Sequence, residues 1–306
     1  MNAAALTVLA VLSGTPAEEL DARLYRGEWE QVLGGLRHQL AATDGGADAA
    51  ARVRASVLLA RAQVTSNAYH LRDEQLADQT SAEALALAEP SKDSALLADA
   101  LMSRGRLLYW RAFKNKQWSV PQELFERARK LYAQVKDTRG EAEAWFYLGL
   151  VEQQQDRLDA GDERFRNGLA QARALKDGVL ESFFHRHLAA SEEDRGHLDQ
   201  AEKGFVESAR LRLEGKACVL SPFAQITLAD FYEKASRSRE KIPALLGEAA
   251  ATATRCGSNV AAIQAHLRLA RTAKSPLERR KHAEQALALA KRFDDDALVK
   301  EAEALF

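Results

Sequence analysis

Bulky and small residues recur along this chain with a period of about forty residues. In the clearest stretch the steps between them are three, one, twelve, four and three, at Trp145, Leu148, Gly149, Gly161, Phe165 and Gly168. Forty residues later the same steps join His185, Leu188, Ala189, Ala201, Phe205 and Ser208. Steps of three and four keep side chains on one face of a helix, so each stretch predicts two helices joined by a turn.

Lys-Asp pairs separate these stretches. They stand at 92–93, 136–137 and 176–177, and a small residue follows each Asp by twelve positions. The resulting period of 40 to 44 residues predicts about seven helix hairpins and a C-terminal cap. Their expected bounds are 17–43, 48–90, 93–136, 137–176, 177–216, 217–257 and 258–293, with the cap over 294–306.

The residue types at these positions have a packing reason. A small residue on the first helix lets the second helix approach closely, and an aromatic side chain fills the groove between hairpins. Composition agrees, because good helix formers dominate, Pro is scarce at six residues, and 46% of residues are hydrophobic. We therefore expect an all-α protein.

The pattern of a large residue, Leu and a small residue, followed by small, aromatic and small, resembles the tetratricopeptide repeat. Two repeats carry every signature residue. The forty-residue period is similar to the long-repeat subgroup found in bacterial peptide-pheromone receptors, sensor arms of multidomain regulators, kinesin light chains and polarity adaptors. The resemblance implies a right-handed superhelical solenoid of antiparallel hairpins whose concave groove binds a protein or peptide. It favours a non-catalytic scaffold or adaptor, with a peptide-sensing regulatory domain as the alternative.

In such an array the first helix of each hairpin lines the groove. Counting from the small residue places ten binding candidates there in repeats two to five: Arg54, Arg61, Arg106, Tyr109, Trp110, Phe146, Gln153, Phe183, Arg186 and Glu193. The same count in repeats six and seven places Asp230, Glu233 and Arg271 on that side. A chaperone-type carboxylate clamp needs Asn one position after the small residue, and none occurs there.

Two groups of these residues have a second interpretation. Arg61 and Arg106 recur at one position of adjacent repeats and could bind a carboxylate, or they could pair with Asp99 or Glu74. Near the long turn at 114–118, Trp110, Phe113 and Trp118 could form an exposed binding hot spot, or Trp110 and Trp118 could plug a gap between hairpins.

Charge and motifs point away from several function classes. The chain has 43 basic and 44 acidic residues, so no field of one sign favours nucleic acid. No phosphate-binding loop or metal-ligand spacing occurs, and we predict no cofactor, metal or catalytic residue. His187, Ser191 and Asp194 share one helix, which does not assemble a triad, so a hydrolase-type enzyme is the weakest alternative.

The ends and the cysteines leave further alternatives. Residues 3–12 are an apolar run too short to span a bilayer. Either they pack as an N-terminal helix of a cytoplasmic protein, or 1–17 act as an export signal. Cys218 begins one helix and Cys256 ends the next, so they are either disulfide-bonded or two unrelated buried residues. A weakly capped terminal repeat could also mediate weak self-association.

Overall fold

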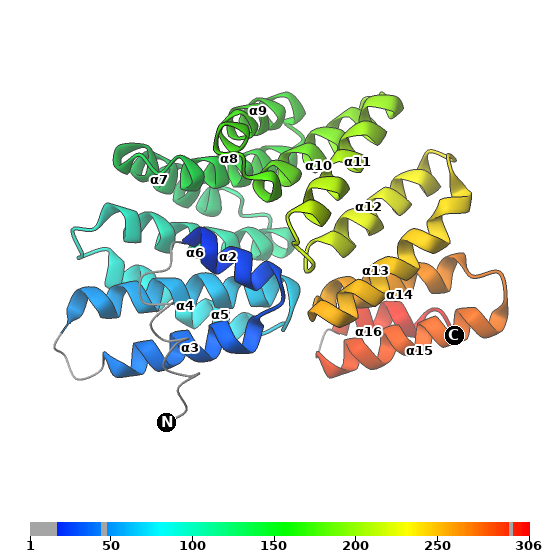
Figure 1. Cartoon of the computed structure of the whole chain (residues 1–306), viewed down its shortest axis with the longest axis horizontal. Helices are drawn as coiled ribbons and strands as arrows, with labels where there is room; N and C mark the ends of the chain where they lie inside the picture. The colour runs from blue at the N-terminus through cyan, green and yellow to red at the C-terminus, as the bar shows by residue number, and fades with distance from the viewer. Residues whose placement is uncertain (1–16, 44–47, 294–295) are drawn as a thin grey trace. The chain divides into compact units, whose positions relative to one another are not determined.

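A computed structural model describes residues 17–43, 48–293 and 296–306, and these residues form helices without any β-strand (Figure 1). The all-α prediction is therefore confirmed. The apolar run at 3–12 lies outside the described residues, so both interpretations of the N-terminus stay predictions. By their contacts, the described residues divide into two compact units.

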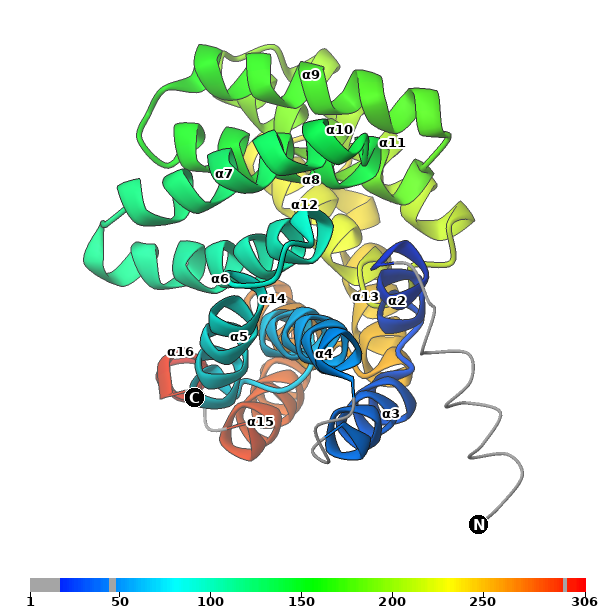
Figure 2. The same cartoon turned by 90° about the vertical axis from the view of Figure 1, so that its left-hand side faces the viewer.

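The first compact unit comprises residues 17–24, 28–43, 48–66 and 73–187. Its helices are α2 Ala17–Tyr25, α3 Trp29–Ala42, α4 Ala49–Tyr69, α5 Glu74–Ala88, α6 Ser94–Asn115, α7 Ser119–Val135, α8 Thr138–Gln153 and α9 Leu158–Leu175. Consecutive helices pack on one another, as α6 to α9 show in Figure 2. Helix α10, Gly178–Asp194, belongs to this unit as far as His187.

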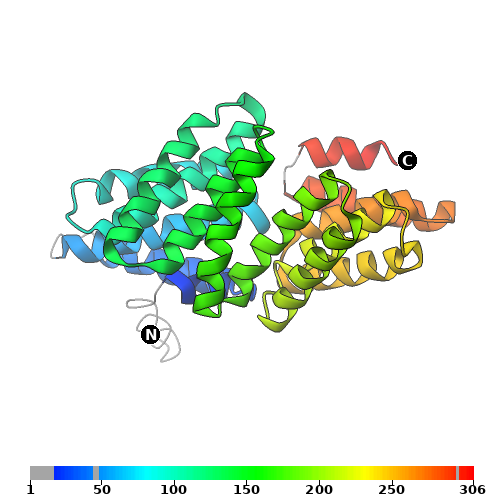
Figure 3. The same ribbon diagram turned by 90° about the horizontal axis from the view of Figure 1, so that it is seen from above.

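The second compact unit comprises residues 25–27, 67–72, 188–293 and 296–306. Its helices are the end of α10, α11 Leu198–Glu214, α12 Ser221–Lys234, the short 3₁₀ helix η1 Arg239–Lys241, α13 Ile242–Cys256, α14 Asn259–Thr272, α15 Pro276–Arg292 and α16 Asp296–Glu303. Here too neighbours in sequence pack together, and α16 lies against α14 and α15 (Figure 3).

The Lys-Asp pairs owe their recurrence to helix ends. Lys136 and Lys176 each follow a helix in the left-handed conformation, with φ of 61° and 57°. The Asp that follows each of them accepts a hydrogen bond from a backbone N–H of the next helix, 2.9 Å long at both Asp137 and Asp177. One residue therefore ends a hairpin and the next begins another, which satisfies backbone groups that a helix end leaves unpaired.

The small residues of the pattern lie where aromatic rings press on the helix backbone. A Cβ atom added to Gly149 would overlap the Phe165 ring, and one added to Gly105 would meet Phe125 at 2.6 Å. Both rings are fully buried. Within each hairpin, the ring thus occupies the space that a larger residue on the first helix would need.

The bulky position that opens each signature is not buried as the pattern predicts. The Trp145 ring lies between the guanidinium groups of Arg129 and Arg164, at 4.5 and 5.1 Å from the ring centre. In the next repeat, His185 is partly exposed and hydrogen bonds to Glu181 at 3.1 Å. Both bulky residues are therefore half-buried and have charged partners.

Cys218 and Cys256 form a disulfide within the second compact unit, with Cα atoms 6.1 Å apart. Cys218 lies in the turn before α12, and Cys256 is the last residue of α13. The antiparallel course of α12 and α13 returns the chain to this turn, which brings the two residues together. The disulfide interpretation of the two cysteines is therefore confirmed.

We expect Gly149→Ala to destabilise the protein by about 1 to 2 kcal/mol, since overpacking against the buried Phe165 ring outweighs the gain in helix propensity. Urea unfolding followed by circular dichroism measures the change. The matched control is Gly247→Ala on α13, where nothing lies within 4 Å of an added Cβ, and it should stabilise by about 0.5 to 1 kcal/mol. Equal effects of the two substitutions would contradict the packing argument.

Reducing the Cys218–Cys256 bond should lower the free energy of unfolding by up to about 4 kcal/mol, because the cross-link restricts the unfolded chain over a separation of 38 residues. Urea unfolding with and without a phosphine reductant tests this. The Cys218→Ser, Cys256→Ser double variant should be less stable than the oxidised protein and indifferent to reductant. A wild-type midpoint that does not move on reduction would refute the prediction.

Candidate functional site

Charged side chains from four helices meet in the interior of the first compact unit. Arg61 on α4 donates to both carboxylate oxygens of Asp21 on α2, at 2.9 and 2.6 Å, and to Glu143 on α8 at 2.5 Å. Its guanidinium is also 3.9 Å from Asp99 on α6. We call Asp21, Arg61, Asp99, Arg139 and Glu143 the ion cluster.

Arg61 is 1% exposed, so the ion cluster replaces its hydration shell entirely. Burial by itself disfavours the charge of Asp21, but the adjacent guanidinium groups of Arg61 and Arg139 lower the pKa of that carboxyl to about 2. Arg139 lies 3.3 Å from Asp21 and also donates to Asp177 at 3.0 Å. Removing one partner of such a group leaves a buried charge uncompensated, which is strongly destabilising.

Asp99 differs from Asp21, because the pKa of its carboxyl is raised instead of lowered. Burial raises its pKa to about 6, although the charge of Arg61 and a hydrogen bond from Tyr132 favour the ionised form. That hydrogen bond is 2.6 Å from the Tyr132 hydroxyl to the carboxylate. Arg61 is 3.9 Å away and directs its close bonds to Asp21 and Glu143, so it compensates Asp99 incompletely.

Arg61 and Arg106 were predicted to lie on an accessible surface, but in the structure both side chains are buried. Arg106 is buried, donates to the Thr65 hydroxyl at 3.1 Å and lies 3.6 Å from Glu143. Arg61 pairs with Asp99, as the second interpretation held, whereas Glu74 pairs with Arg111. Of the predicted arginines in this unit, Arg54 is exposed and Arg186 is half-buried.

A series of aromatic rings crosses α6, α8 and α10 in the first compact unit. Successive ring centres are 5.4, 6.1, 5.3 and 5.2 Å apart. We call this series the aromatic band, and in order it comprises Trp110, Tyr109, Tyr147, Phe146 and Phe183. Four of its five members are among the predicted groove residues, but Tyr109, Tyr147 and Phe146 are buried, so within the band only Trp110 and Phe183 at its ends are accessible.

The exposed end of the aromatic band is on α6. Trp110 is 46% exposed and stacks on Phe113, 38% exposed, with ring centres 5.8 Å apart and planes at 23°. Trp118 is buried beneath them, 5.2 Å from Phe113 and 5.7 Å from Tyr109. Trp118 thus fills the gap opened by the long turn, while Trp110 and Phe113 face outward.

Basic residues outnumber acidic ones around Trp110 and Phe113. Arg111 bonds to Glu74 and Asp78 at 2.6 and 2.8 Å, and Lys114 lies 3.7 Å from Glu74. Arg104 also bonds to Asp78, and Lys116 is exposed at the end of α6. In the sequence, the segment 110–116 that carries the two rings holds three basic residues and no acidic one.

Polar groups accompany the other end of the band. His187 lies 5.3 Å from Phe146 between ring centres, and its Nδ1 is 3.0 Å from Oε1 of Gln153. Arg186 is close enough to Tyr109 to act on its hydroxyl electrostatically. Gln153, Phe183 and Arg186 are all half-buried, so this end presents a partly accessible mixture of apolar and polar groups.

The predicted residues of the second compact unit line a pocket of about 300 Å³ on α12 and α14. Its walls are Asp230, Glu233, Lys234, Arg268, Arg271 and Thr272. Arg268 donates two hydrogen bonds to the Asp230 carboxylate, at 2.6 and 2.8 Å, and Arg271 donates one to Glu301 at 2.6 Å. Glu193 bonds to Lys234 at 2.9 Å. These charges largely neutralise one another.

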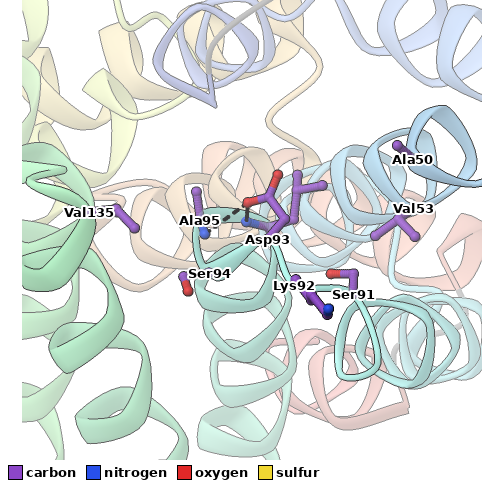
Figure 4. Close-up of a pocket in the computed structure, with 9 residues that line it drawn as sticks. Ala50, Val53, Ser91, Lys92, Asp93, Ser94, Ala95 and Val135 are labelled. Atoms are coloured by element: carbon purple, nitrogen blue, oxygen red, sulfur yellow. Dashed lines mark hydrogen bonds between the residues drawn. The ribbon is translucent and has the colours of Figure 1, made fainter.

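A second pocket, of about 560 Å³, lies at the ends of helices in the first compact unit (Figure 4). Ala50 and Val53 of α4 face the turn that carries Ser91 and Lys92, and Val135 completes the wall. Asp93 here accepts hydrogen bonds from the N–H groups of Ala95 and Leu96 at 3.0 Å. Since this carboxylate already caps α6, the pocket is poorly suited to an anion.

Sequence reasoning missed three members of the ion cluster: Asp21, Arg139 and Glu143. Asp21 belongs to the most degenerate repeat, and Arg139 and Glu143 precede the positions counted from the small residue. Nothing in the spacing marks them, because their meeting depends on how α2 and α8 approach α4. In the part of the chain that the structure covers, no helix has the length and apolarity to cross a membrane. Within the same residues, no three side chains of His, Cys, Asp or Glu gather as metal ligands.

No protein-family model and no curated protein matches the sequence. Solved structures show the fold. A Rap protein complexed with Competence and Sporulation Factor is similar with a TM-score of 0.62 and 14% identity, over 95% of this chain and 96% of that one. The apo form of RapI is similar with a TM-score of 0.55 and 11% identity, over 81% and 94%.

A signal-transduction ATPase from Pyrococcus horikoshii, with a tetratricopeptide repeat sensor, has a TM-score of 0.50 and 14% identity. The similarity covers 92% of this chain and 39% of that one. At these identities the comparisons establish the fold alone. The chain has a helical repeat fold of the tetratricopeptide type, as its sequence pattern predicted.

Asp99 should make stability fall as pH rises from about 4 to about 6. Its folded pKa of about 6 exceeds the ordinary 3.8, so the folded protein binds the proton more tightly, and that stabilisation is lost as the group ionises. Asp99→Asn keeps an oxygen for Tyr132 and removes the titration. The variant should match wild type near pH 4 and exceed it by up to about 3 kcal/mol near pH 7.

Urea unfolding of both proteins at several pH values measures this difference. Comparing the two proteins cancels the titration of every other group that the substitution leaves unchanged. A difference that does not vary with pH would show that Asp99 has an ordinary pKa in the folded protein.

Proposed function

We propose that this protein is a non-catalytic scaffold that binds a protein or peptide on the aromatic band of the first compact unit. The main observation in support of this proposal is that Trp110 and Phe113 are exposed at one end of a continuous series of rings. Large aromatic side chains that are exposed yet held in place lose little entropy on binding, and they dominate the energetics of protein interfaces.

The surroundings of the band indicate what the partner carries. Arg61 and Arg106 offer no free surface to a ligand, since both are buried against carboxylates of the same chain. Arg111, Lys114 and Lys116 adjoin Trp110 and Phe113 in the segment 110–116, which has no acidic residue. An excess of basic groups beside apolar rings favours a peptide with an apolar anchor and flanking acidic residues.

A peptide-sensing regulatory domain is the second candidate. It is favoured by the similarity to a Rap protein whose structure contains Competence and Sporulation Factor, over nearly the full length of both chains. In a sensor, peptide binding shifts the protein between two conformations, whereas a passive scaffold binds without such a shift. Small-angle scattering that changes saturably with peptide would support the sensor.

The proposal predicts that peptides selected by the protein bind through Trp110 and Phe113. A phage library of random twelve-residue peptides provides the probe, and the enriched sequences should combine an aromatic or aliphatic residue with Asp or Glu. Replacing both aromatic residues in Trp110→Ala, Phe113→Ala should weaken a selected peptide by roughly 10- to 30-fold, as for other interface hot spots. Fluorescence polarisation with the labelled peptide measures the affinity.

Leu175→Ala is the matched control. Leu175 is also in the first compact unit and is 44% exposed, close to the exposure of Trp110, but it lies at the end of α9 outside the aromatic band. The control should bind the peptide as wild type does. Equal affinity in the double variant and wild type would exclude the aromatic band as the binding site.

A further inference from the structure

Two histidines of the last hairpin face each other at a distance typical of ligands on one metal ion. His266 is on α14 and His282 is on α15, and their Nδ1 atoms are 3.2 Å apart. The rings are nearly parallel, with planes at 23° and centres 5.4 Å apart. Neither residue belongs to the aromatic band, so a role for this histidine pair does not depend on the proposed peptide binding.

The facing nitrogen atoms need a proton on one of them, which lets the Nδ1–H of one neutral ring donate to the Nδ1 lone pair of the other. Neutral imidazole has one N–H and one lone pair, so two Nδ1 lone pairs at this distance would repel unless one nitrogen carries a proton. A metal ion can take the place of that proton. Two imidazole ligands on tetrahedral zinc, at about 2.0 to 2.1 Å each, stand about 3.3 to 3.4 Å apart. The observed separation needs an adjustment of only a few tenths of an ångström.

We infer that His266 and His282 form a binding site for a single divalent transition-metal ion of the kind that imidazole prefers, Zn²⁺, Ni²⁺ or Cu²⁺. The two imidazole nitrogen atoms are the protein ligands. Water completes the coordination, because both side chains are partly exposed and solvent can reach the site. A site with two protein ligands binds more weakly than a closed structural zinc site, which has four.

The helices hold the two rings in register. His266 stands between buried Ala265 and Leu267 on α14, and buried Ala283 follows His282 on α15. Helices α14 and α15 pack closely as one hairpin. Gln285 hydrogen bonds to the His282 side chain and so restrains that ring. Ligands on packed helices, with a further hydrogen bond to the ring, lose little freedom when a metal binds.

Charges near the pair act in both directions. Lys281 acts on both histidines and disfavours an added cation, while Glu278, one helical turn before His282, favours one. The unfavourable effect of Lys281 on a bound cation is therefore offset by the favourable effect of Glu278. Both cysteines are joined in the disulfide, so no free thiol among the described residues competes for the metal.

Isothermal titration with Zn²⁺ and with Ni²⁺ tests the site, on the full chain without a histidine tag. A buffer near pH 7.5 keeps most ordinary histidines neutral. Wild type should bind one ion of either metal per chain. His266→Ala and His282→Ala should each weaken this binding at least tenfold, since either change leaves one protein ligand. Co²⁺ absorption in the visible range, sensitive to imidazole coordination, should appear in wild type and be lost in both variants.

His197→Ala is the matched control, because His197 is also exposed and lies 2.7 Å from a carboxylate oxygen of Glu192, an arrangement that could bind metal elsewhere. It should leave the affinity and the stoichiometry unchanged. His282→Gln, which keeps a polar side chain on α15, guards against loss of folding and should still weaken binding. Absence of saturable one-to-one binding in wild type, or wild-type affinity in either the His266→Ala or the His282→Ala variant, would overturn the inference.

Discussion

The close approach of helices at the small positions of each repeat is the constraint on which the rest of the structure depends. Gly149 and Gly105 leave room for the rings of Phe165 and Phe125, and the rings then exclude water from the joint between the two helices. Gly168 does the same for Phe184, which belongs to the next hairpin along the chain. Contacts within and between hairpins thus follow one rule. At 136–137 and 176–177 the Lys ends one helix and the Asp caps the next.

This packing brings side chains of the first helices together, and their chemistry then determines whether they are buried. Where α2, α4, α6 and α8 meet, opposite charges pair and are buried as the ion cluster. Farther along the same helices, aromatic side chains meet and one end stays exposed. A guanidinium that is paired with carboxylates can be buried, and it is then not accessible to a ligand. The stacked Trp and Phe at the end of a helix instead leave apolar surface exposed to water. That difference moves the candidate binding surface from the arginines to the aromatic band.

Both proposals place recognition on side chains that rigid helices hold. The aromatic band offers preformed apolar surface beside cations, and the histidine pair of α14 and α15 offers two nitrogen atoms already close to metal-ligand spacing. They lie in different compact units and involve different chemistry. The similarity to Rap proteins at 14% and 11% identity shows how far this fold persists while surface residues change, so function must be argued from these sites.

The sequence by itself determined the helical class, the forty-residue period and the position of most turns, because spacing on a helix and capping at its ends are local properties. It also placed Tyr109, Trp110, Phe146 and Phe183 on the first helices of neighbouring hairpins, and it predicted that Cys218 and Cys256 could lie near each other. Only the tertiary structure decided that Arg61 is buried, since its partners Asp21 and Glu143 are 40 and 82 residues away and carry no spacing signal. The same holds for His266 and His282, because the distance between two side chains on adjacent helices depends on how closely and at what rotation those helices pack.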